Sequence, residues 1–373
     1  MNKRVVTRRR FLAQSGRMAL GAQALFLAGS PTGFGADNTR TNVLLFLVDD
    51  MGWTDLSCFG SAVYETSAID RLATQGMRFT NAYSACTVCS PTRASILTGK
   101  YPARLHLTDW IPGHPNPKGK LKPPAFNQEL PHEEITLAEM LKPHGYTSAS
   151  IGKWHLGDEP YYPETQGFDL NVGGTKKGQP PSYFSPYQIP TLQDGPEGEN
   201  LTDRMAAEAI HFIEQNRDRT FFVYLPFFAV HTPLQAKKEY IEKYQAKIQP
   251  GMAQHDPVYA SMVQNVDESV GRVLARLDEL GLAEQTLVIF TSDNGGLIPK
   301  TSNLPLRAGK GSAYEGGVRV PMIVRGKGWV RPGSVCDTPV MSIDLFPTIL
   351  DILQIPQDAE HPVDGVSLAP LLQ

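Results

Sequence analysis

Apolar residues follow two alternating patterns along most of the chain. Continuous apolar runs are typical of strands that are buried on both faces, and a repeat of three to four positions is typical of amphipathic helices. The continuous runs predict strands within residues 42–50, 147–154, 221–228, 286–296 and 320–326. Because each run is separated from the next by helical segments, the strands are expected to pair mostly in parallel.

The helical pattern occurs between these runs. Short helices are predicted over 67–77 and 136–146, the second ending near Pro143. A third is predicted over 202–216 with Thr202 or Asp203 as its N-cap, and a last one over 342–355 with Ser342 as its cap.

The longest predicted helix begins near Asp256. Its apolar positions share one face: Tyr259, Met262, Val263, Val266, Val270, Val273, Leu274 and Leu277. Together with the strands, these helices predict an α/β sandwich of three layers around a large, mostly parallel sheet.

Composition narrows the class of protein. The chain has 373 residues, of which 41% are hydrophobic and 20% charged, enough for one large domain or two modest ones. Its net charge of -3 gives no basic excess of the kind that nucleic-acid-binding domains carry. Four cysteines are too few for a disulfide scaffold, although a structural disulfide among Cys58, Cys86 and Cys336 stays open.

The first 36 residues resemble a twin-arginine export signal. A basic region that contains Arg8, Arg9 and Arg10 precedes an apolar stretch of 12 residues, which is too short to cross a bilayer. The alternative is a basic tail followed by a helix. The resemblance predicts export through the twin-arginine translocase to the periplasm or the medium, without a stable membrane anchor, and a mature domain over 38–373.

Polar residues gather where the predicted strands end. Parallel strands present their carboxyl ends at one edge of a sheet, where ligands bind. The residues concerned are Asp49, Asp50, Lys153, His155, His231, Asp293 and Asn294, and a glycine-rich loop adds Lys310. Taken singly, the acidic pairs are good turn sequences, His155 could be structural, and Lys310 could be a solvated lysine.

Convergence at one edge favours a functional site over these separate explanations. Carboxylate and amide oxygens suit a hard cation such as Ca²⁺ or Mg²⁺. Lysine, arginine and histidine beside that cation suit an anionic substrate. From the residues alone, the prediction is metal-assisted cleavage of a phosphate or sulfate ester.

The stretch "SACTVCSPTRASILTG" holds two cysteines, Cys86 and Cys89. A redox pair would leave the cation cluster without a purpose, and a zinc site lacks a second cysteine or histidine pair nearby. The segment after Cys89 predicts the start of a helix, which would place residue 89 at a positive helix end that suits an anion.

"CSPTRASILTG" resembles the signature of the sulfatase family, in which a cysteine becomes formylglycine before use. Other blocks of the chain resemble the family in the family's order: "LLFLVDDMGWTDLSCFG", "IGKWHLG", "FFAVHTP", "TSDNGG" and "LRAGKGSAYEGGVRVP". The resemblance covers about residues 40–373 and is closest to the branch of arylsulfatase A and N-acetylgalactosamine-6-sulfatase. It implies an alkaline phosphatase-like fold and a formylglycine-generating or sulfatase-maturating enzyme as a partner.

The resemblance also implies roles for single residues. Asp49, Asp50, Asp293 and Asn294 would hold Ca²⁺, with Mg²⁺ as the less favoured ion, together with the modified Cys89. Arg93 and Lys153 would orient the hydrated aldehyde, and His155 would be the base. His231 and Lys310 would bind sulfate and assist the leaving oxygen.

Three functions compete at this stage. The first is hydrolysis of sulfate esters of a sulfated carbohydrate or an aryl sulfate. The second is hydrolysis of phosphomonoesters or phosphonate esters on the same fold, and the third is binding without catalysis. Two loops that mix basic and aromatic residues, 109–128 and 175–190, are the expected specificity loops. The first of them is either a pocket-lining loop or mobile.

The sequence ends at Gln373 with "PVDGVSLAPLLQ". In similar sulfatases this phrase precedes a smaller C-terminal subdomain built on an antiparallel sheet. The expectation is a complete large domain without that subdomain.

Overall fold

The computed structural model describes residues 41–114 and 119–373. The predicted export signal, 1–36, lies outside the described residues. Within the described ranges, no helix is both long and apolar enough to cross a membrane.

All five predicted strands are confirmed: β1 (Asn42–Val48), β3 (Thr147–Ile151), β5 (Phe221–Pro226), β6 (Thr286–Ser292) and β7 (Arg319–Arg325). Four more join them in one sheet: β2 (Met77–Tyr83), β4 (Leu170–Val172), β8 (Ser334–Cys336) and β9 (Val340–Met341). The strand order is β4-β3-β5-β1-β6-β7-β2-β8, and β9 pairs with β2. Among the strand pairs in the described ranges, only those of β7 with β6 and with β2 are antiparallel. The sheet is therefore mostly parallel, as predicted.

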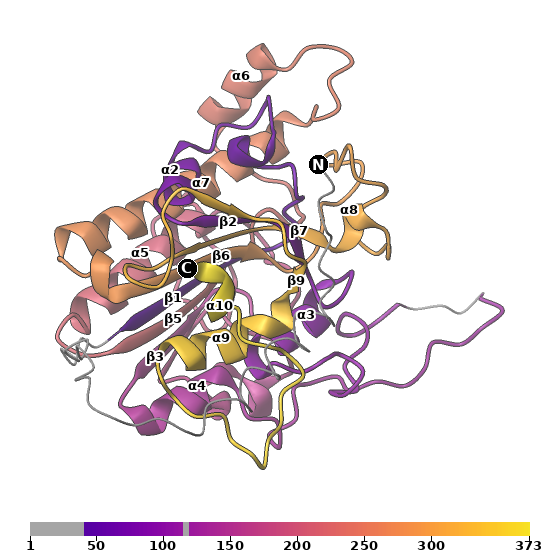
Figure 1. Cartoon of the computed structure of the whole chain (residues 1–373). Helices are drawn as coiled ribbons and strands as arrows, with labels where there is room; N and C mark the ends of the chain where they lie inside the picture. The colour runs from indigo at the N-terminus through magenta and orange to yellow at the C-terminus, as the bar shows by residue number, and fades with distance from the viewer. Residues whose placement is uncertain (1–40, 115–118) are drawn as a thin grey trace, which may run out of the picture. The chain divides into compact units, whose positions relative to one another are not determined.

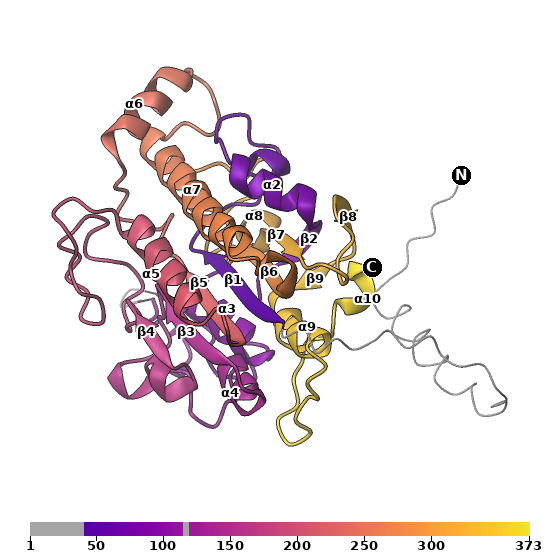
Figure 2. The same cartoon turned by 90° about the vertical axis from the view of Figure 1, so that its left-hand side faces the viewer.

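Strand β1 lies inside the sheet and supplies both faces with apolar side chains. Leu44, Phe46 and Val48 point to one core, and the alternate residues point to the other. The first core is covered by α2 (Ser67–Gln75), α5 (Leu201–Gln215) and α7 (Pro257–Glu279), with α6 (Lys238–Lys247) outside them. The second is covered by α3 (Cys89–Thr98), α4 (Leu137–Leu141), α9 (Leu345–Ile352) and α10 (Ala369–Leu372) (Figures 1 and 2). The predicted three-layer sandwich is therefore confirmed.

Shorter helical segments lie in the connections. Helix α8 (Glu315–Val318) precedes β7. The 3₁₀ turns are η1 (Ser57–Phe59), η2 (Lys142–His144), η3 (Glu159–Tyr161), η4 (Pro163–Gln166), η5 (Ala283–Gln285) and η6 (Ser342–Asp344). Since α4 ends at Leu141 and passes into η2, the predicted end near Pro143 is confirmed.

The helix caps test the predictions more finely. The predicted start of the longest helix near Asp256 is confirmed, and Asp256 caps α7 by accepting hydrogen bonds from the backbone N–H groups of Val258 and Tyr259. For α5 the predicted cap is wrong: Asn200 is the N-cap, and its side chain accepts from Thr202 N. Thr202 already belongs to the first helical turn, so its own N–H is one of the donors that a cap must satisfy.

The predicted cap Ser342 is also wrong. This residue opens η6, and its hydroxyl accepts a hydrogen bond from Ala85 N, on another segment. Asp344 precedes α9 and accepts from the backbone of Met341 and Val366. The Ser342 side chain, which the local sequence would assign to capping the helix, is used instead in a tertiary contact with Ala85.

All four cysteines lie in the described ranges, and all four are free thiols. The structural disulfide left open for Cys58, Cys86 and Cys336 is not formed. Burial raises the pKa of the Cys86 thiol, with no strong cationic neighbour to offset it. Cys86 is therefore a thiol that burial keeps protonated.

Candidate active site

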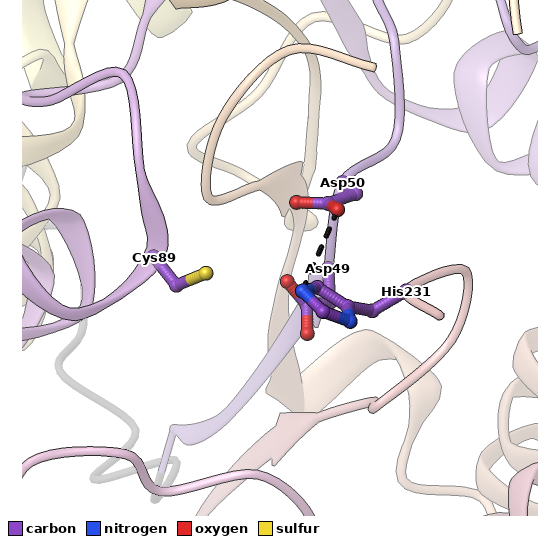
Figure 3. Close-up of side chains that lie close together, drawn as sticks. All are labelled: Asp49, Asp50, Cys89 and His231. Atoms are coloured by element: carbon purple, nitrogen blue, oxygen red, sulfur yellow. Dashed lines mark ion pairs between the residues drawn. The ribbon is translucent and has the colours of Figure 1, made fainter. Parts of the chain in front are cut away.

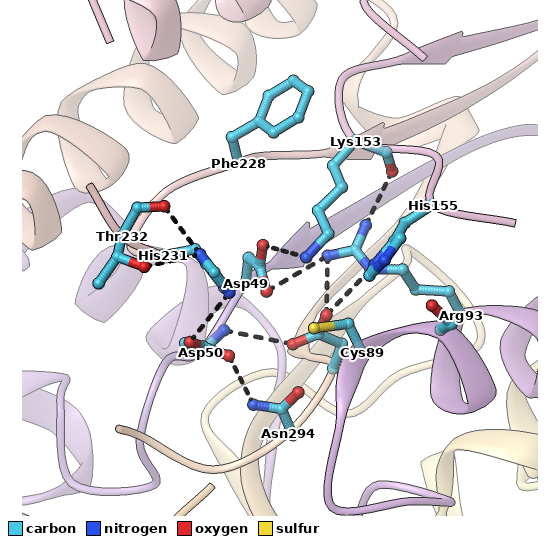
Figure 4. A network of polar contacts seen from close by, with 12 residues as sticks. Asp49, Asp50, Cys89, Arg93, Lys153, His155, Phe228, His231, Thr232 and Asn294 are labelled. Atoms are coloured by element: carbon cyan, nitrogen blue, oxygen red, sulfur yellow. Dashed lines mark hydrogen bonds and ion pairs between the residues drawn. The ribbon is translucent and has the colours of Figure 1, made fainter. Parts of the chain in front are cut away.

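The polar residues predicted to converge do so at the carboxyl ends of β1, β3, β5 and β6 (Figure 4). These strands run parallel and neighbour one another, so their ends meet at one edge. Into this edge come side chains from two other places. Cys89 is the first residue of α3, and Lys310 lies on the loop between β6 and α8.

Cys89 lies almost fully buried at the N-terminus of α3. Lys310 Nζ approaches its sulfur at 3.7 Å. Burial opposes ionisation of the thiol, but the charges of Lys153 and Lys310 outweigh it and hold the pKa of Cys89 well below its usual range. The site therefore stabilises negative charge at residue 89.

The floor of the site is a network of buried charges. Lys153 Nζ lies 2.6 Å from Asp49 Oδ2, and both side chains are inaccessible to solvent. Arg93 donates to Asp293 Oδ2 through Nε at 2.9 Å and through a terminal nitrogen at 2.8 Å. Its other terminal nitrogen donates to the backbone oxygen of Lys153 at 2.8 Å. Each of these charges thus has an opposite charge or a hydrogen bond inside the protein, as burial requires.

Asp50 links this floor to the loops above it. Lys310 Nζ lies 2.7 Å from Asp50 Oδ1, and Asn294 Nδ2 donates to the same oxygen at 2.8 Å. Asp293 Oδ1 accepts from Asp50 N at 3.2 Å. Asp50 has a φ of 64°, and His155 has a φ of 61°, a backbone region that costs residues with a side chain free energy. Strain at these two site residues is held by the surrounding contacts.

The donor set fits a divalent cation. Two buried oxygens at the floor, Asp49 Oδ1 and Asn294 Oδ1, have no hydrogen-bond partner among the described residues. Asp49, Asp50, Cys89 and His231 each offer a ligand atom, and the four atoms lie within 4.8 Å of one another (Figure 3). Carboxylate and amide oxygens without donors are what a hard cation would satisfy.

His231 is an addition to the predicted ligand neighbourhood. Sequence reasoning assigned it to sulfate and the leaving oxygen, and gave the cation no imidazole. The structure places its Nε2 3.7 Å from Asp50 Oδ2. Asp293, which was also predicted as a ligand, already accepts a hydrogen bond at each oxygen, from Arg93 and from Asp50 N.

The two histidines have opposite protonation. His155 Nε2 lies 2.6 Å from the carbonyl oxygen of Ile111, so Nε2 carries a hydrogen and Nδ1 is left without a partner among the described atoms. Burial lowers the pKa of His155, although the neighbouring Cys89 acts in the opposite direction. His155 is thus a neutral imidazole whose Nδ1 lone pair can accept a proton.

His231 favours the charged form. Burial lowers the pKa of this imidazole, but Asp49 and Asp50 outweigh it and raise the pKa to about 9 in the metal-free site. Nδ1 donates to the backbone oxygen of Thr232 at 2.8 Å, which leaves Nε2–H directed to Asp50 (Figure 4). His231 can therefore donate a proton at Nε2.

A cavity of about 1130 Å³ opens above these residues. Cys89, His155, His231 and Lys310 line it. Its walls come from both predicted specificity loops: Trp110, Ile111, Pro112, His114 and Gln128 from the first, and Lys176, Lys177, Gly178 and Gln179 from the second. The expectation that loop 109–128 lines a pocket is therefore confirmed for these five residues.

One residue that sequence reasoning missed is Asp55. It is fully buried, and Oδ2 accepts from Gly52 N at 2.7 Å and from the Tyr259 hydroxyl at 2.6 Å. Oδ1 accepts from the Thr301 hydroxyl at 2.6 Å and from Gln254 at 3.1 Å. Asp55 thereby ties the turn after Asp50 to the loop that leads from Asn294 to Lys310. The signal was present as a third acid in "DDMGWTD", close behind the strand.

The blocks that form this site also decide the family. The sulfatase family model matches residues 41–355. The chain belongs to the sulfatase family. Among curated relatives, N-acetylgalactosamine-6-sulfatase of Rattus norvegicus is 34% identical over 95% of this chain and 68% of its own length. Steryl-sulfatase of Homo sapiens is 30% identical over 90% of this chain and 70% of its own length.

A solved structure shares the same architecture. The crystal structure of Ps i-CgsB in complex with k-i-k-neocarrahexaose has a TM-score of 0.77 and 30% identity, over 89% of this chain and 76% of that one. The predicted family and the alkaline phosphatase-like fold are thus confirmed. This sulfatase is a sulfuric ester hydrolase, and the cluster of aspartate, cysteine and histidine is compatible with the divalent metal that the family uses.

Proposed function

We propose that this sulfatase hydrolyses sulfate esters of a carbohydrate, through formylglycine made from Cys89 and with the assistance of Ca²⁺. The observation that carries the proposal is the position of Cys89. It stands at a helix N-terminus on the floor of a large cavity, beside Lys310 and a cluster of unpartnered oxygens.

The Cys89 sulfur marks where a hydroxyl oxygen of a hydrated aldehyde would lie. Such a hydrate supplies two hydroxyl groups on one carbon, one to attack the sulfur of the ester and one whose loss of a proton expels sulfate. His155 accepts a proton at Nδ1, because Ile111 holds Nε2 in its donor form.

His231 and Lys310 act on the substrate side of residue 89. Lys310 neutralises charge on the sulfate oxygens, and His231 gives a proton from Nε2 to the leaving oxygen. The Nδ1–H of His231 donates to the backbone oxygen of Thr232, which leaves Nε2 as the nitrogen that faces Asp50 and the cavity. Both residues line the cavity, within reach of a bound ester.

Asp49, Asp50, Asp293 and Asn294 would hold Ca²⁺ together with residue 89. Their oxygens are the ligands that Ca²⁺ prefers, and Mg²⁺ is the second choice. When bound, the cation would favour the ionised form of the hydroxyl at residue 89. Arg93 and Lys153 offset the remaining negative charge beneath it.

Support for a carbohydrate comes from the relatives and from the cavity. One relative is an N-acetylgalactosamine-6-sulfatase, and one similar structure binds k-i-k-neocarrahexaose. The cavity exceeds the range of about 300–1,000 Å³ common for small-molecule sites, so it has room for more than a single sugar. Lysine and tryptophan in its walls suit a sulfated sugar.

Export belongs to the same proposal. The basic and apolar pattern of residues 1–36 supports passage through the twin-arginine translocase to the periplasm or the medium. Because that route carries folded proteins, a formylglycine-generating or sulfatase-maturating enzyme would act on Cys89 in the cytoplasm. A reporter fused to residues 1–36 should appear outside the cytoplasm, and a reporter that stays inside contradicts this step.

Mass spectrometry combined with kinetics tests the catalytic proposal. The tryptic peptide that ends at Arg93 should have lost sulfur at residue 89 in active protein. The same preparation should cleave 4-nitrophenyl sulfate far faster than 4-nitrophenyl phosphate. Full activity with an intact thiol contradicts the formylglycine, and faster cleavage of the phosphate favours the phosphoester alternative.

A further inference from the structure

A second cavity adjoins the one above Cys89. Its volume is about 480 Å³, and four residues line both cavities: Asp158, Lys176, Lys177 and Gln179. The two cavities therefore share a wall. An occupant of the first that is longer than one sugar would meet this wall and the space beyond it.

The shared wall is fixed to the catalytic base at two points. The backbone oxygen of Thr175 accepts a hydrogen bond from His155 N at 2.9 Å. The backbone of Gly178 packs closely against the His155 imidazole, since a Cβ at this position would come within 2.5 Å of His155 Cε1. Lys176 and Lys177 stand between these two anchors, so their backbone has a defined distance from the reaction centre although their side chains are exposed.

The two lysines differ in charge balance. Lys176 forms an ion pair with Asp158. Lys177 has no ion pair with any residue in the described ranges, and its backbone N–H donates to the Thr175 hydroxyl at 3.2 Å. Lys177 also helps to lower the pKa of the Asp158 carboxyl, but that carboxylate is already paired with Lys176. An exposed cation that lines two cavities and has no ion pair of its own among the described residues can receive an anion from a ligand.

The second cavity has the lining that a sugar ring requires. Pro180, Pro190, Ile189 and Phe228 form apolar surface against which the C–H face of a ring can pack. Gln188 adds an amide at the rim and has a φ of 56°. Asp194 Oδ1 stabilises this strained turn by accepting from the N–H groups of Tyr187 and Gln188.

We propose that the second cavity binds a further sugar residue of an oligosaccharide substrate, and that Lys177 contacts a sulfate or carboxylate group on that residue. The proposal rests on the proposed function, and it narrows the substrate to a chain with at least two anionic groups. One ester lies above residue 89, and the second group lies across the shared wall.

The test compares a long and a short substrate in matched variants. Wild type, Lys177→Ala and a charge control, Lys238→Ala, are assayed with 4-nitrophenyl sulfate and with carrageenan and chondroitin sulfate oligosaccharides of two to six sugars. Lys238 is an exposed lysine on α6 that lines neither cavity. The measured quantity is the ratio of kcat/KM for the oligosaccharide to kcat/KM for the aryl ester.

We expect Lys177→Ala to lower this ratio about tenfold, mainly through KM, since one hydrogen bond to a charged group is lost. Gln188→Ala should lower it a few-fold, and Lys238→Ala should leave it as in wild type. An unchanged ratio in Lys177→Ala, or equal losses on both substrates, overturns the second subsite. Failure of the proposed function would appear earlier and separately, as a wild-type enzyme that cleaves the aryl sulfate and no oligosaccharide.

Discussion

The floor of the active site and the rim of its cavity differ in how their charged side chains are compensated. At the floor, Asp49, Arg93, Lys153 and Asp293 are inaccessible to solvent and hold one another through ion pairs. At the rim, Lys176 and Lys177 are exposed and come from the loop between β4 and α5. Removing one charge from the floor leaves another buried without a partner, whereas a charge at the rim is compensated by water.

Because of this difference, we expect the floor to govern the reaction itself and the rim to govern which substrates are preferred. Three of these floor residues, Asp49, Lys153 and Asp293, follow strand ends, whose backbone is fixed by the sheet, and Arg93 lies on α3. The floor side chains therefore keep one geometry for any ester. The rim lies on two long loops, which can change sequence without disturbing the core. Substitutions at the floor should therefore affect all substrates, and those at the rim should affect some substrates more than others.

The largest effect is expected at residue 89. Cys89→Ala removes the group that becomes the nucleophile, and kcat/KM for 4-nitrophenyl sulfate should fall by about 10⁴-fold or more. The side chain is small and its contact with Lys310 is long, at 3.7 Å, so the melting temperature should change little. Circular dichroism of the same sample provides the control. Residual activity above a hundredth of wild type would contradict the assignment.

Arg93→Met should have the next largest effect. It leaves the carboxylate of Asp293 buried without its strongest partner, which typically costs about 3–5 kcal/mol of unfolding free energy. Arg272→Met is the matched control, because its ion pair with Asp203 is half exposed and should contribute about 1 kcal/mol or less. Urea unfolding of both variants measures the difference. Similar losses in the two would show that the floor is not special.

The pH profile should report the two histidines. His155 must be neutral, so kcat/KM should fall as pH drops through its pKa, which burial holds below 6.5. His231 must be protonated, so activity should fall as pH rises through about 9, or through the value that the bound cation sets.

The variant His231→Gln separates the two limbs of this profile. It should lose about 10²-fold in kcat and no longer show the alkaline limb, while the acid limb remains. A profile in which the alkaline limb persists in His231→Gln would assign that limb to another group.

A smaller effect is expected at Asp55, which supports the floor from behind. Asp55→Asn places an amide N–H₂ where four donors converge, so the turn that carries Asp50 should loosen. The affinity for Ca²⁺, measured by calorimetry, should fall about tenfold. Asp267→Asn is the control, because that buried carboxylate accepts from Ala68 N and Ile69 N at the start of α2, away from the site. Equal Ca²⁺ affinity in both variants would exclude this positioning role.

Much of the fold followed from patterns that are local in the chain. A run such as "NVLLFLV" must be buried on both faces, and the repeat from Tyr259 to Leu277 covers one side of the sheet. The cap at Asp256 was also predictable, because a helix start uses side chains a few residues away. The caps predicted at Thr202 and Ser342 were wrong for different reasons: Asn200 offers an equally local cap for α5, whereas the Ser342 hydroxyl accepts from the distant Ala85 N.

For the site, the sequence by itself determined which side chains stand at the strand ends, because strand direction and the parallel sheet bring those ends to one edge. Only the tertiary structure decided how these side chains are used. The tautomer of His155 depends on the carbonyl of Ile111 and its neutral state depends on burial, and the charge of His231 depends on Asp49 and Asp50, all far away in the chain. The role of Asp55 likewise depends on Tyr259 and Thr301. Protonation and positioning depend on distances of a few ångströms between segments that the fold alone brings together, so no local pattern encodes them.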